Sequence, residues 1–406
     1  MNELDLLVEN YFTDSFEASD LFRLVEQAMD ESEENPCAKF PNRGEVAEGI
    51  VAAALAAKFA KRIGGKIGNI SSADIQTVIG RIEGQGIEII TDVEDFPVDG
   101  RVQVSDNVYL SISMGSRAFK ALVDPNKLIC LQGEYDGAVA YVNEEYMTKF
   151  ATRLASNQKA NKILVQAAGT KDQKGTKVDI FLNVDGGKVR KQISLKVEGG
   201  DQFAQKGGRE FKHQQQFWDH LGIDISNVEG GFDAIMSEVP IGYVFDSRED
   251  IDKLQLVEKT ASALTLTYKE AFEQLGEKLN GDVKEEAFMK KLISFIREGA
   301  TGKDAEFIEL VKIQPGSFKR ARFGKQFEQT IRNMNLFARY HQDGLYPQIY
   351  IDARIQDETT GETKEVPIVR FRGRAGRPSN KAKTKYGVYV RNYIESRDGL
   401  YELAKI

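Results

Sequence analysis

Residues 162–200, which read KILVQAAGTKDQKGTKVDIFLNVDGGKVRKQISLKVEGG, decide the fold of this chain. The segment holds three runs of strand-forming residues separated by polar and glycine-containing turns, namely 163–167, 177–184 and 189–197. Asp185-Gly186-Gly187, between the second and third runs, is a strong signal for a tight hairpin. The stretch therefore predicts three consecutive strands of one sheet.

The third run shows most clearly how residues are divided between two faces of a strand. Ile193, Leu195 and Val197 alternate with polar residues, and this two-residue period is typical of a strand with one buried face. The polar positions of the same run are Gln192, Ser194 and Lys196.

Helical and strand-like patterns surround this segment. We expect helices at 45–63, which is rich in alanine, at 143–158, at 201–221 except for Gly207-Gly208, across 247–335, and at 392–403. Strand character returns at 348–352 and 368–372. The mixture predicts an α/β fold of the mixed α+β type, with a central mixed sheet flanked by helices.

Asp179 and Lys196 lie on neighbouring strands of the expected hairpin, so their side chains can meet at one edge of the sheet. A carboxylate beside a lysine suits phosphodiester hydrolysis. The carboxylate can hold Mg²⁺, and the lysine can orient the attacking water or stabilise charge on the phosphorane oxygens. The alternative interpretation is a half-buried hairpin whose polar face carries these two residues without any catalytic role.

Five pieces of the sequence resemble one family. Three of them are similar to the core of the PD-(D/E)xK nuclease superfamily, in particular to phage-encoded and restriction-type endonucleases: Lys177-Val178-Asp179-Ile180, Ile193-Ser194-Leu195-Lys196 and Gly199-Gly200-Asp201-Gln202-Phe203-Ala204-Gln205. Gly44-Glu45-Val46-Ala47-Glu48-Gly49 resembles the preceding helix, which supplies a glutamate to the metal site. Residues 385–395 are similar to the basic closing strand and helix of such phage proteins.

The resemblance implies a restriction-endonuclease-like core whose active site lies where the strands of Asp179 and Lys196 diverge. It implies that Asp179 and a second carboxylate bind Mg²⁺ or Mn²⁺, that Lys196 positions the nucleophilic water, and that DNA is the substrate. The family usually has Asp or Glu two residues before the lysine, and here that position is Ser194.

Some restriction enzymes with this serine recruit a carboxylate from elsewhere. Glu48 is the first candidate for that role, and Glu210 and Glu198 are the others. If Gln202 and Gln205 lie one helical turn apart, Gln205 can face the site; the alternative is a solvated glutamine at the start of an amphipathic helix.

We expect four parts along the chain. They are an acidic N-terminal helical segment at 1–40, a first part of the nuclease-like core at 41–235, a helical insertion at 236–345, and a second part of the core at 346–406 with the basic closing strand and helix.

The formal net charge of −7 is unevenly distributed. Residues 1–40 hold eleven acids and two bases, a balance of −9, so the remaining residues total −7 − (−9) = +2. Residues 366–391 contain eight bases and no acid, which suits contact with the phosphates of DNA. The residues expected to bind nucleic acid are Arg370, Arg372, Arg374, Arg377, Lys381, Lys385 and Arg391.

Hydrophobicity and cysteine content indicate the compartment in which we expect the protein. The apolar run at 50–57 is far shorter than the roughly 20 residues of a membrane span, so we expect no membrane contact. Cys37 and Cys130 are too few for a disulfide framework, and a reducing cytoplasm fits this cysteine usage best. For a phage-encoded protein this would be the host cytoplasm.

The sequence thus predicts a Mg²⁺-dependent DNA endonuclease, and a homodimer is an option because double-strand cutters often work in pairs. The main alternative is a catalytically silent DNA-binding protein that keeps the nuclease fold, which Ser194 would favour. A third hypothesis is an interaction protein that docks a partner through its acidic N-terminal segment and its helical insertion.

Overall fold

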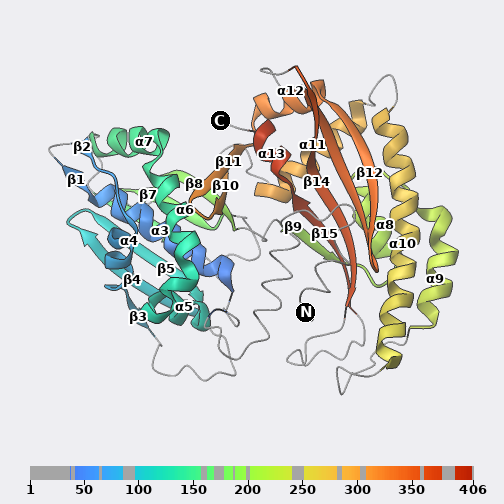
Figure 1. Ribbon diagram of the computed structural model, residues 1–406, viewed down its shortest axis with the longest axis horizontal. Coiled ribbons are helices and arrows are strands. Elements are labelled where there is room, and N and C mark those ends of the chain that lie inside the picture. The colour runs from blue at the N-terminus through green and yellow to red at the C-terminus, as the bar shows by residue number, and fades with distance from the viewer. Residues whose placement is uncertain are drawn as a thin grey trace, which may run out of the picture.

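A computed structural model of the chain describes most residues from Asn42 onwards (Figure 1). The described residues are Cys37, 42–63, 66–85, 97–156, 162–168, 178–185, 188–197, 202–239, 251–280, 286–301, 308–356, 361–376 and 389–404. The acidic segment expected at 1–40 therefore lies, apart from Cys37, outside the described residues. Helices and strands form two large hydrophobic cores, each built around its own sheet. We call each core with its sheet and helices a body: the first body contains the eight-stranded sheet, and the second contains the five-stranded sheet.

The first core contains a mixed sheet of eight strands. In spatial order these are β11 (Ser317–Arg322), β10 (Ile308–Gln314), β8 (Lys188–Val197), β7 (Ile180–Val184), β6 (Ile163–Ala167), β5 (Val108–Gly115), β4 (Pro97–Ser105) and β3 (Glu83–Gln85). The pairs β5–β6 and β8–β10 are parallel, and the other neighbours are antiparallel. The predicted mixed α/β architecture is confirmed.

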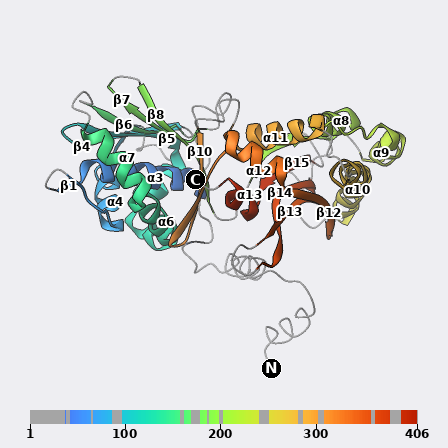
Figure 2. The same ribbon diagram turned by 90° about the horizontal axis from the view of Figure 1, so that it is seen from above.

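Helices cover one face of this sheet (Figure 2). They are α3 (Arg43–Ala60), α4 (Ser72–Ile79), α5 (Ser116–Val123), α6 (Gln132–Asn143) and α7 (Glu145–Ser156), with the short 3₁₀-helix η2 (Pro125–Leu131) before α6 and a two-stranded hairpin, β1 (Arg62–Ile63) and β2 (Lys66–Ile67), after α3. The alanine-rich α3 is buried along nearly its whole length and packs against β5, β6 and β8. Its small side chains let the helix lie close to the sheet.

The three strands expected between 162 and 200 are present as β6, β7 and β8, which are consecutive neighbours in the sheet. On β7 and β8 the side chains of Ile180, Leu182, Ile193 and Leu195 are buried in the first core, as the alternation predicts. Asp185, at the end of β7, has a positive φ of 50°, a conformation that occurs in tight hairpin turns.

The segment expected to be a helical insertion, 236–345, is only partly helical. The helices α10 (Ile251–Asn280) and α11 (Glu286–Thr301) are present, but β10 and β11 then form a hairpin that extends the first sheet beside β8. Pro315-Gly316 makes the turn, with Gly316 at φ 66°. The helical expectation was wrong here because a fully buried strand has no alternating pattern to distinguish it.

The second core contains an antiparallel sheet of five strands. In spatial order these are β12 (Asn335–Asp343), β13 (Tyr346–Gln356), β14 (Thr363–Gly376), β15 (Tyr389–Ser396) and β9 (Gln202–Gly207). Its helices are α8 (Phe211–Asp219), α9 (Glu229–Ser237), α10, α11, α12 (Lys325–Asn333) and α13 (Asp398–Leu403), with the 3₁₀-helix η4 (Ser226–Val228). Helix α10 lies along β12, β13 and β14.

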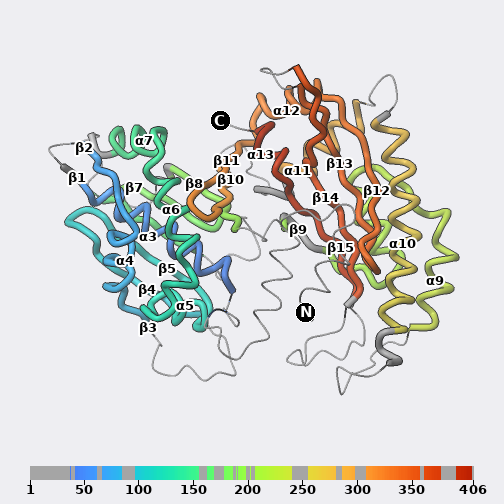
Figure 3. The backbone as a smooth tube through the Cα atoms, viewed as in Figure 1, coloured from blue at the N-terminus to red at the C-terminus, as the bar shows by residue number. Residues whose placement is uncertain are grey.

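Two local expectations are corrected in this part. Residues 202–207 form the strand β9 and not a helix, since they pair with β15 in the second sheet, and Figure 3 traces β9 beside β15. The closing helix expected at 392–403 is shortened to α13, because residues 389–396 form β15. The strands from 346 onwards therefore belong to the second sheet and do not complete the sheet of Asp179 and Lys196.

The two cores meet along β10 and β11. Leu310 and Ala321 come from these strands but are buried in the second core. The backbone N–H of Arg322 donates to the carbonyl of Ala404 at 3.1 Å, and Lys312 lies 3.5 Å from Asp398 at the start of α13. The hairpin between the two sheets, visible in Figure 2, therefore belongs to both bodies.

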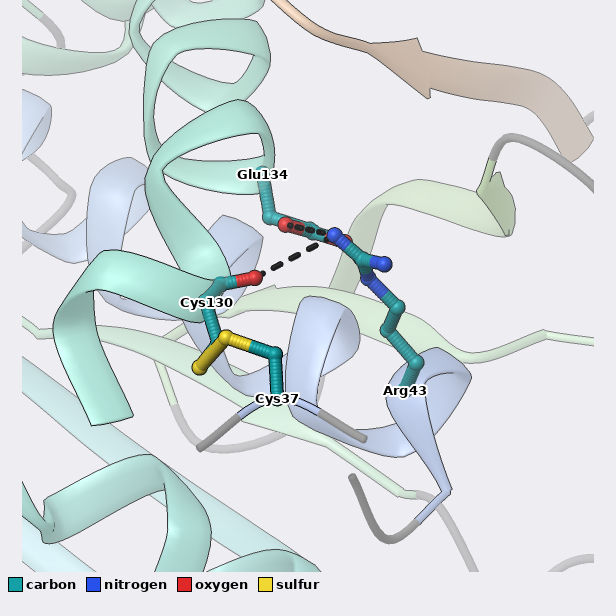
Figure 4. Close-up of a disulfide and its surroundings, with 4 residues drawn as sticks. All are labelled: Cys37, Arg43, Cys130 and Glu134. Atoms are coloured by element: carbon teal, nitrogen blue, oxygen red, sulfur yellow. Dashed lines mark hydrogen bonds and ion pairs between the residues drawn. A yellow bond between two sulfur atoms is a disulfide. The ribbon is translucent and has the colours of Figure 1, made fainter. Parts of the chain in front are cut away.

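A disulfide joins Cys37 to Cys130, which lies in η2 (Figure 4). Arg43, in the first turn of α3, forms an ion pair with Glu134 and donates to the carbonyl of Cys130 at 3.2 Å. This bond differs from the reduced state that the small number of cysteines suggested, because two cysteines suffice for one bridge when the fold brings them together. Among the described residues, no helix is both long and apolar enough to cross a bilayer.

Candidate functional site

Asp179 is held at the point where β7 begins. Its backbone carbonyl accepts from the N–H of Ala168 at 2.9 Å, and its own N–H donates to the carbonyl of Ile193 at 2.8 Å. These two bonds attach Asp179 to the strands on either side. The Oδ2 atom also accepts from the N–H of Leu195 at 2.5 Å, so the carboxylate is directed towards the end of β8.

Lys196 lies where β7 and β8 separate. Ile180–Ile193 is the last β7–β8 pair at this end, and β8 continues to Val197 beside β10. The ammonium group of Lys196 lies 4.0 Å from Asp179 Oδ2. The Lys196 side chain is 16% exposed and the Asp179 side chain 25% exposed, so the pair is largely buried but still reaches solvent.

Glu48 reaches the same place from α3. Burial raises the pKa of Glu48 well above its ordinary value, and the negative charge of Asp179 raises this pKa further, whereas Lys196 lowers it. The acidic side chain of Glu45 also raises the pKa of Glu48. The helix, the start of β7 and the end of β8 thus bring two carboxylates and one ammonium group together.

Glu45 lies one helical turn before Glu48, and its carboxylate makes a structural contact with the sheet. Its Oε2 atom accepts from the backbone N–H of Gly115 at 3.0 Å, at the end of β5. This hydrogen bond ties the first turn of α3 to the sheet, which helps to fix where Glu48 lies.

The residues at this site fit a divalent cation. Burial contributes most to the raised pKa of Glu48, and repulsion by the neighbouring Asp179 carboxylate adds to it. Mg²⁺ is commonly bound through one or two carboxylates, with water and substrate phosphates as its other ligands. In the described part of the chain, no group of three or more His, Cys, Asp or Glu side chains could hold a metal by itself.

Ser194, at the position of the usual family acid, is fully buried. Its hydroxyl oxygen accepts from the Lys196 ammonium at 3.3 Å, and the carbonyl of Leu195 accepts from the same group at 3.0 Å. Ser194 therefore holds the lysine side chain and contributes no charge to the site.

Glu210 is not at this site, contrary to expectation. It is exposed, precedes α8 and forms an ion pair of 2.5 Å with Lys212, which together with its hydrogen bond lowers the pKa of Glu210. The reason is that β9 joins the second sheet and carries α8 into the second core. Glu198 lies outside the described residues.

Gln205 has a different setting from the expected helix. It lies on β9 opposite Tyr393 of β15, so the helical spacing to Gln202 does not apply. The expectation that Gln205 faces Asp179 and Lys196 therefore stays a prediction, and helical spacing no longer supports it.

Three of the predicted DNA-binding arginines alternate along β14 and share one face of the second sheet, namely Arg370, Arg372 and Arg374. Glu395 forms ion pairs with Arg370 and Arg372, whose side chains are only 15% and 18% exposed. Arg391, opposite Arg374 on β15, is exposed. Arg377, Lys381 and Lys385 lie outside the described residues.

Two of these arginines also make cation–π contacts with tyrosine rings. The guanidinium carbon of Arg370 lies 5.9 Å from the centre of the Tyr350 ring, and that of Arg374 lies 5.8 Å from Tyr346. Such contacts hold a guanidinium group in place without neutralising its charge.

Sequence reasoning missed Glu309 and Lys312, which β10 places beside β8. Glu309 pairs with Lys191, and Lys312 is the direct neighbour of Lys196 in the parallel ladder. The available signal was the turn-forming pair Pro315-Gly316 after the run Ile308–Gln314, which contains three β-branched residues but does not alternate in burial.

An open depression of about 630 Å³ lies in the second body and is lined by residues from α8, α11 and the loop that contains Gly222. It includes Lys212, Asp219 and Lys291 but none of the residues around Asp179. The depression is therefore separate from the cluster that carries the chemistry.

Comparison of the chain with protein-family models, with curated proteins and with solved structures finds no match.

Proposed function

We propose that this protein is a metal-dependent deoxyribonuclease, an endonuclease that hydrolyses phosphodiester bonds in DNA. The observation that carries the proposal is the meeting of Glu48, Asp179 and Lys196, which come from a helix and from two diverging strands. Two carboxylates and an ammonium group, partly open to solvent, are a suitable set of groups for hydrolysing a phosphodiester.

In this proposal Asp179 and Glu48 would hold Mg²⁺ or Mn²⁺. When bound, the cation supplies positive charge to the phosphoryl oxygens and lowers the pKa of a coordinated water. Lys196 orients the attacking water and stabilises charge that develops on the phosphate. Ser194 is a positioning residue, because its hydroxyl accepts a hydrogen bond from Lys196.

Substrate binding would rely on basic residues outside this cluster. Arg374 and Arg391 lie side by side on the second sheet, and Arg391 is exposed. Contacts of this kind supply affinity for phosphates without reading the base sequence.

A plasmid-cleavage assay tests the proposed function. Wild-type protein should nick or cut supercoiled DNA with Mg²⁺ or Mn²⁺ and should stop when EDTA removes the metal. Asp179→Asn, Glu48→Gln and Lys196→Ala should each lower the cleavage rate by about 100-fold or more, because each removes a group that acts on the reacting phosphate. Asp106→Asn, in the exposed β4–β5 turn, is the control for the loss of one acid and should cleave normally. Normal cleavage by the Asp179 and Lys196 variants would refute the proposal.

A second candidate is a catalytically silent DNA-binding protein with the same fold. The buried Ser194 favours it, since this position brings no carboxylate to the site. DNA binding that survives Asp179→Asn and Lys196→Ala, with no cleavage under any divalent cation, would support this function instead.

We further propose that the protein works in the cytoplasm, which for a phage-encoded enzyme is that of the host. The Cys37–Cys130 bond weighs against this location, because disulfides are rare in reducing compartments. A homodimer that places one active site on each DNA strand remains part of the proposal for double-strand cutting.

A further inference from the structure

Three lysines stand side by side across three adjacent strands of the first sheet. Lys196 on β8 is directly opposite Lys312 on β10, and Lys312 is directly opposite Lys319 on β11. Directly paired residues project their side chains to the same face of a sheet. The three ammonium groups therefore belong to one row that starts beside Asp179.

Asp398, the first residue of α13, lies over the outer part of this row. Its carboxylate is 2.9 Å from the Lys319 ammonium and 3.5 Å from that of Lys312. Although burial alone would raise the pKa of Asp398, the hydrogen bond from Lys319 and the charge of Lys312 hold this pKa below its ordinary value. One carboxylate thus serves two lysines.

The exposed fraction of the side chains increases from Lys312 to Lys319 to Asp398. The Lys312 side chain is 7% exposed, the Lys319 side chain 31%, and the Asp398 side chain 53%. Lys312 is therefore a buried charge that needs an anion nearby, and Lys319 can reach solvent. The Asp398 side chain is exposed, so a rotation of this side chain would release the lysines while α13 keeps its buried contacts.

We propose that Lys319, supported by the charge of Lys312, is a phosphate-binding site for the DNA strand that enters the active site, and that Asp398 takes the place of this phosphate in the free protein. The proposal rests on the proposed nuclease function, because it extends that site along the same sheet face.

The dimensions suit a nucleic-acid backbone. Neighbouring strands of a sheet are about 4.8 Å apart, so the row covers roughly 10 Å from β8 to β11. Successive phosphates of one DNA strand rise by about 3.4 Å along the helix axis and also turn around it, so they lie farther apart in space than this rise. Lys319 would therefore contact a phosphate about one or two nucleotides from the scissile bond. Charge-assisted hydrogen bonds from an ammonium to phosphate oxygens would hold it there.

Binding measured apart from cleavage tests this inference. Fluorescence anisotropy of a labelled DNA duplex, with Ca²⁺ replacing Mg²⁺, gives the affinity at several salt concentrations. Lys319→Ala should weaken binding about 5- to 10-fold near 0.1 M salt and should lower the slope of log K against log salt by about one. Asp398→Asn should tighten binding, because it removes the competing carboxylate.

Lys269→Ala is the matched control, since Lys269 is exposed on α10 in the second body and its loss changes the net charge equally. Thermal melting of each variant shows whether it is folded, and Lys319→Arg should restore most of the affinity. If Lys319→Ala binds with the same affinity and salt slope as Lys269→Ala, the inference is wrong. In that case Asp179-dependent cleavage by the wild type would still leave the nuclease proposal standing, whereas a wild type that neither binds nor cuts DNA would overturn both.

Discussion

Lys191 and Glu309 form an ion pair inside the first core, with Nζ and Oε2 at 2.5 Å and side chains only 4% and 1% exposed. The hydroxyl of Tyr141 donates to Glu309 at 3.0 Å. Burial raises the pKa of Tyr141, and the charge of Glu309 raises this pKa further, so the tyrosine stays protonated and keeps donating. Glu309 is therefore the anion on which a buried lysine and a buried tyrosine both depend.

We expect Glu309→Leu to lower the free energy of unfolding by about 3–5 kcal/mol, because it leaves the Lys191 charge buried without its carboxylate. Urea unfolding followed by circular dichroism measures this change. Glu145→Gln is the comparison, since it breaks the exposed pair of Glu145 with Lys149 and should leave stability almost unchanged. Equal losses in the two variants would contradict the role given to Glu309.

At the scale of the element, α6 lies against β10 through Gly137. A Cβ atom at this position would be 2.4 Å from Ile313 Cγ2 and 2.5 Å from the carbonyl oxygen of Gln314. Only glycine lets the helix approach so closely that β10 can stay paired with β8. The packing of one helix thus supports the strand next to Lys196.

Gly137→Ala should lower the free energy of unfolding by about 1–3 kcal/mol, because the added methyl group must push α6 away from β10. Gly230→Ala on α9 makes the same chemical change where nothing lies within 4 Å of the added Cβ, so it should leave stability unchanged or raise it slightly. Differential scanning calorimetry of the two variants checks the contrast. A Gly137→Ala protein that melts like the Gly230→Ala protein would show that α6 can relax without cost.

Helices and strands with a strong local sequence pattern were predicted correctly. Those that depend on a partner far away in the sequence were not. The alanine run predicted α3 closely, and the Asp185-Gly186-Gly187 turn predicted β7 and β8. Residues 202–207 were expected in a helix but pair with β15, which lies far away in the sequence. A local window cannot reveal such a partner, because strand pairing is decided by the tertiary fold.

At the scale of the whole molecule, the chain passes between the two bodies more than once. It leaves the first sheet after β8, adds β9 and several helices to the second body, returns for β10 and β11, and then builds β12 to β15. The strand that carries Lys196, β8, therefore pairs with β10, whose residues follow about a hundred positions later in the chain. Neither body consists of one continuous segment.

A chain that ends at residue 239 would keep Glu48, Asp179 and Lys196 but would lose β10 and β11. We expect this truncated protein to aggregate and to unfold without a cooperative transition, because the edge of β8 is uncovered and Lys191 loses Glu309. Gel filtration and urea unfolding, with the full chain as reference, measure both properties. A monomeric truncated protein that unfolds cooperatively would show that the first body is complete without the hairpin.

The amino-acid sequence by itself determined the α3 helix, the β6–β7–β8 strands and the closeness of Asp179 to Lys196, because residue spacing and turn residues act over short distances along the chain. Only the tertiary structure decided that Glu48 joins them, that Glu210 does not, and that β10 brings Lys312 beside Lys196. The physical reason is that burial and strand pairing join residues that no local pattern connects, and the charges at the site depend on those partners.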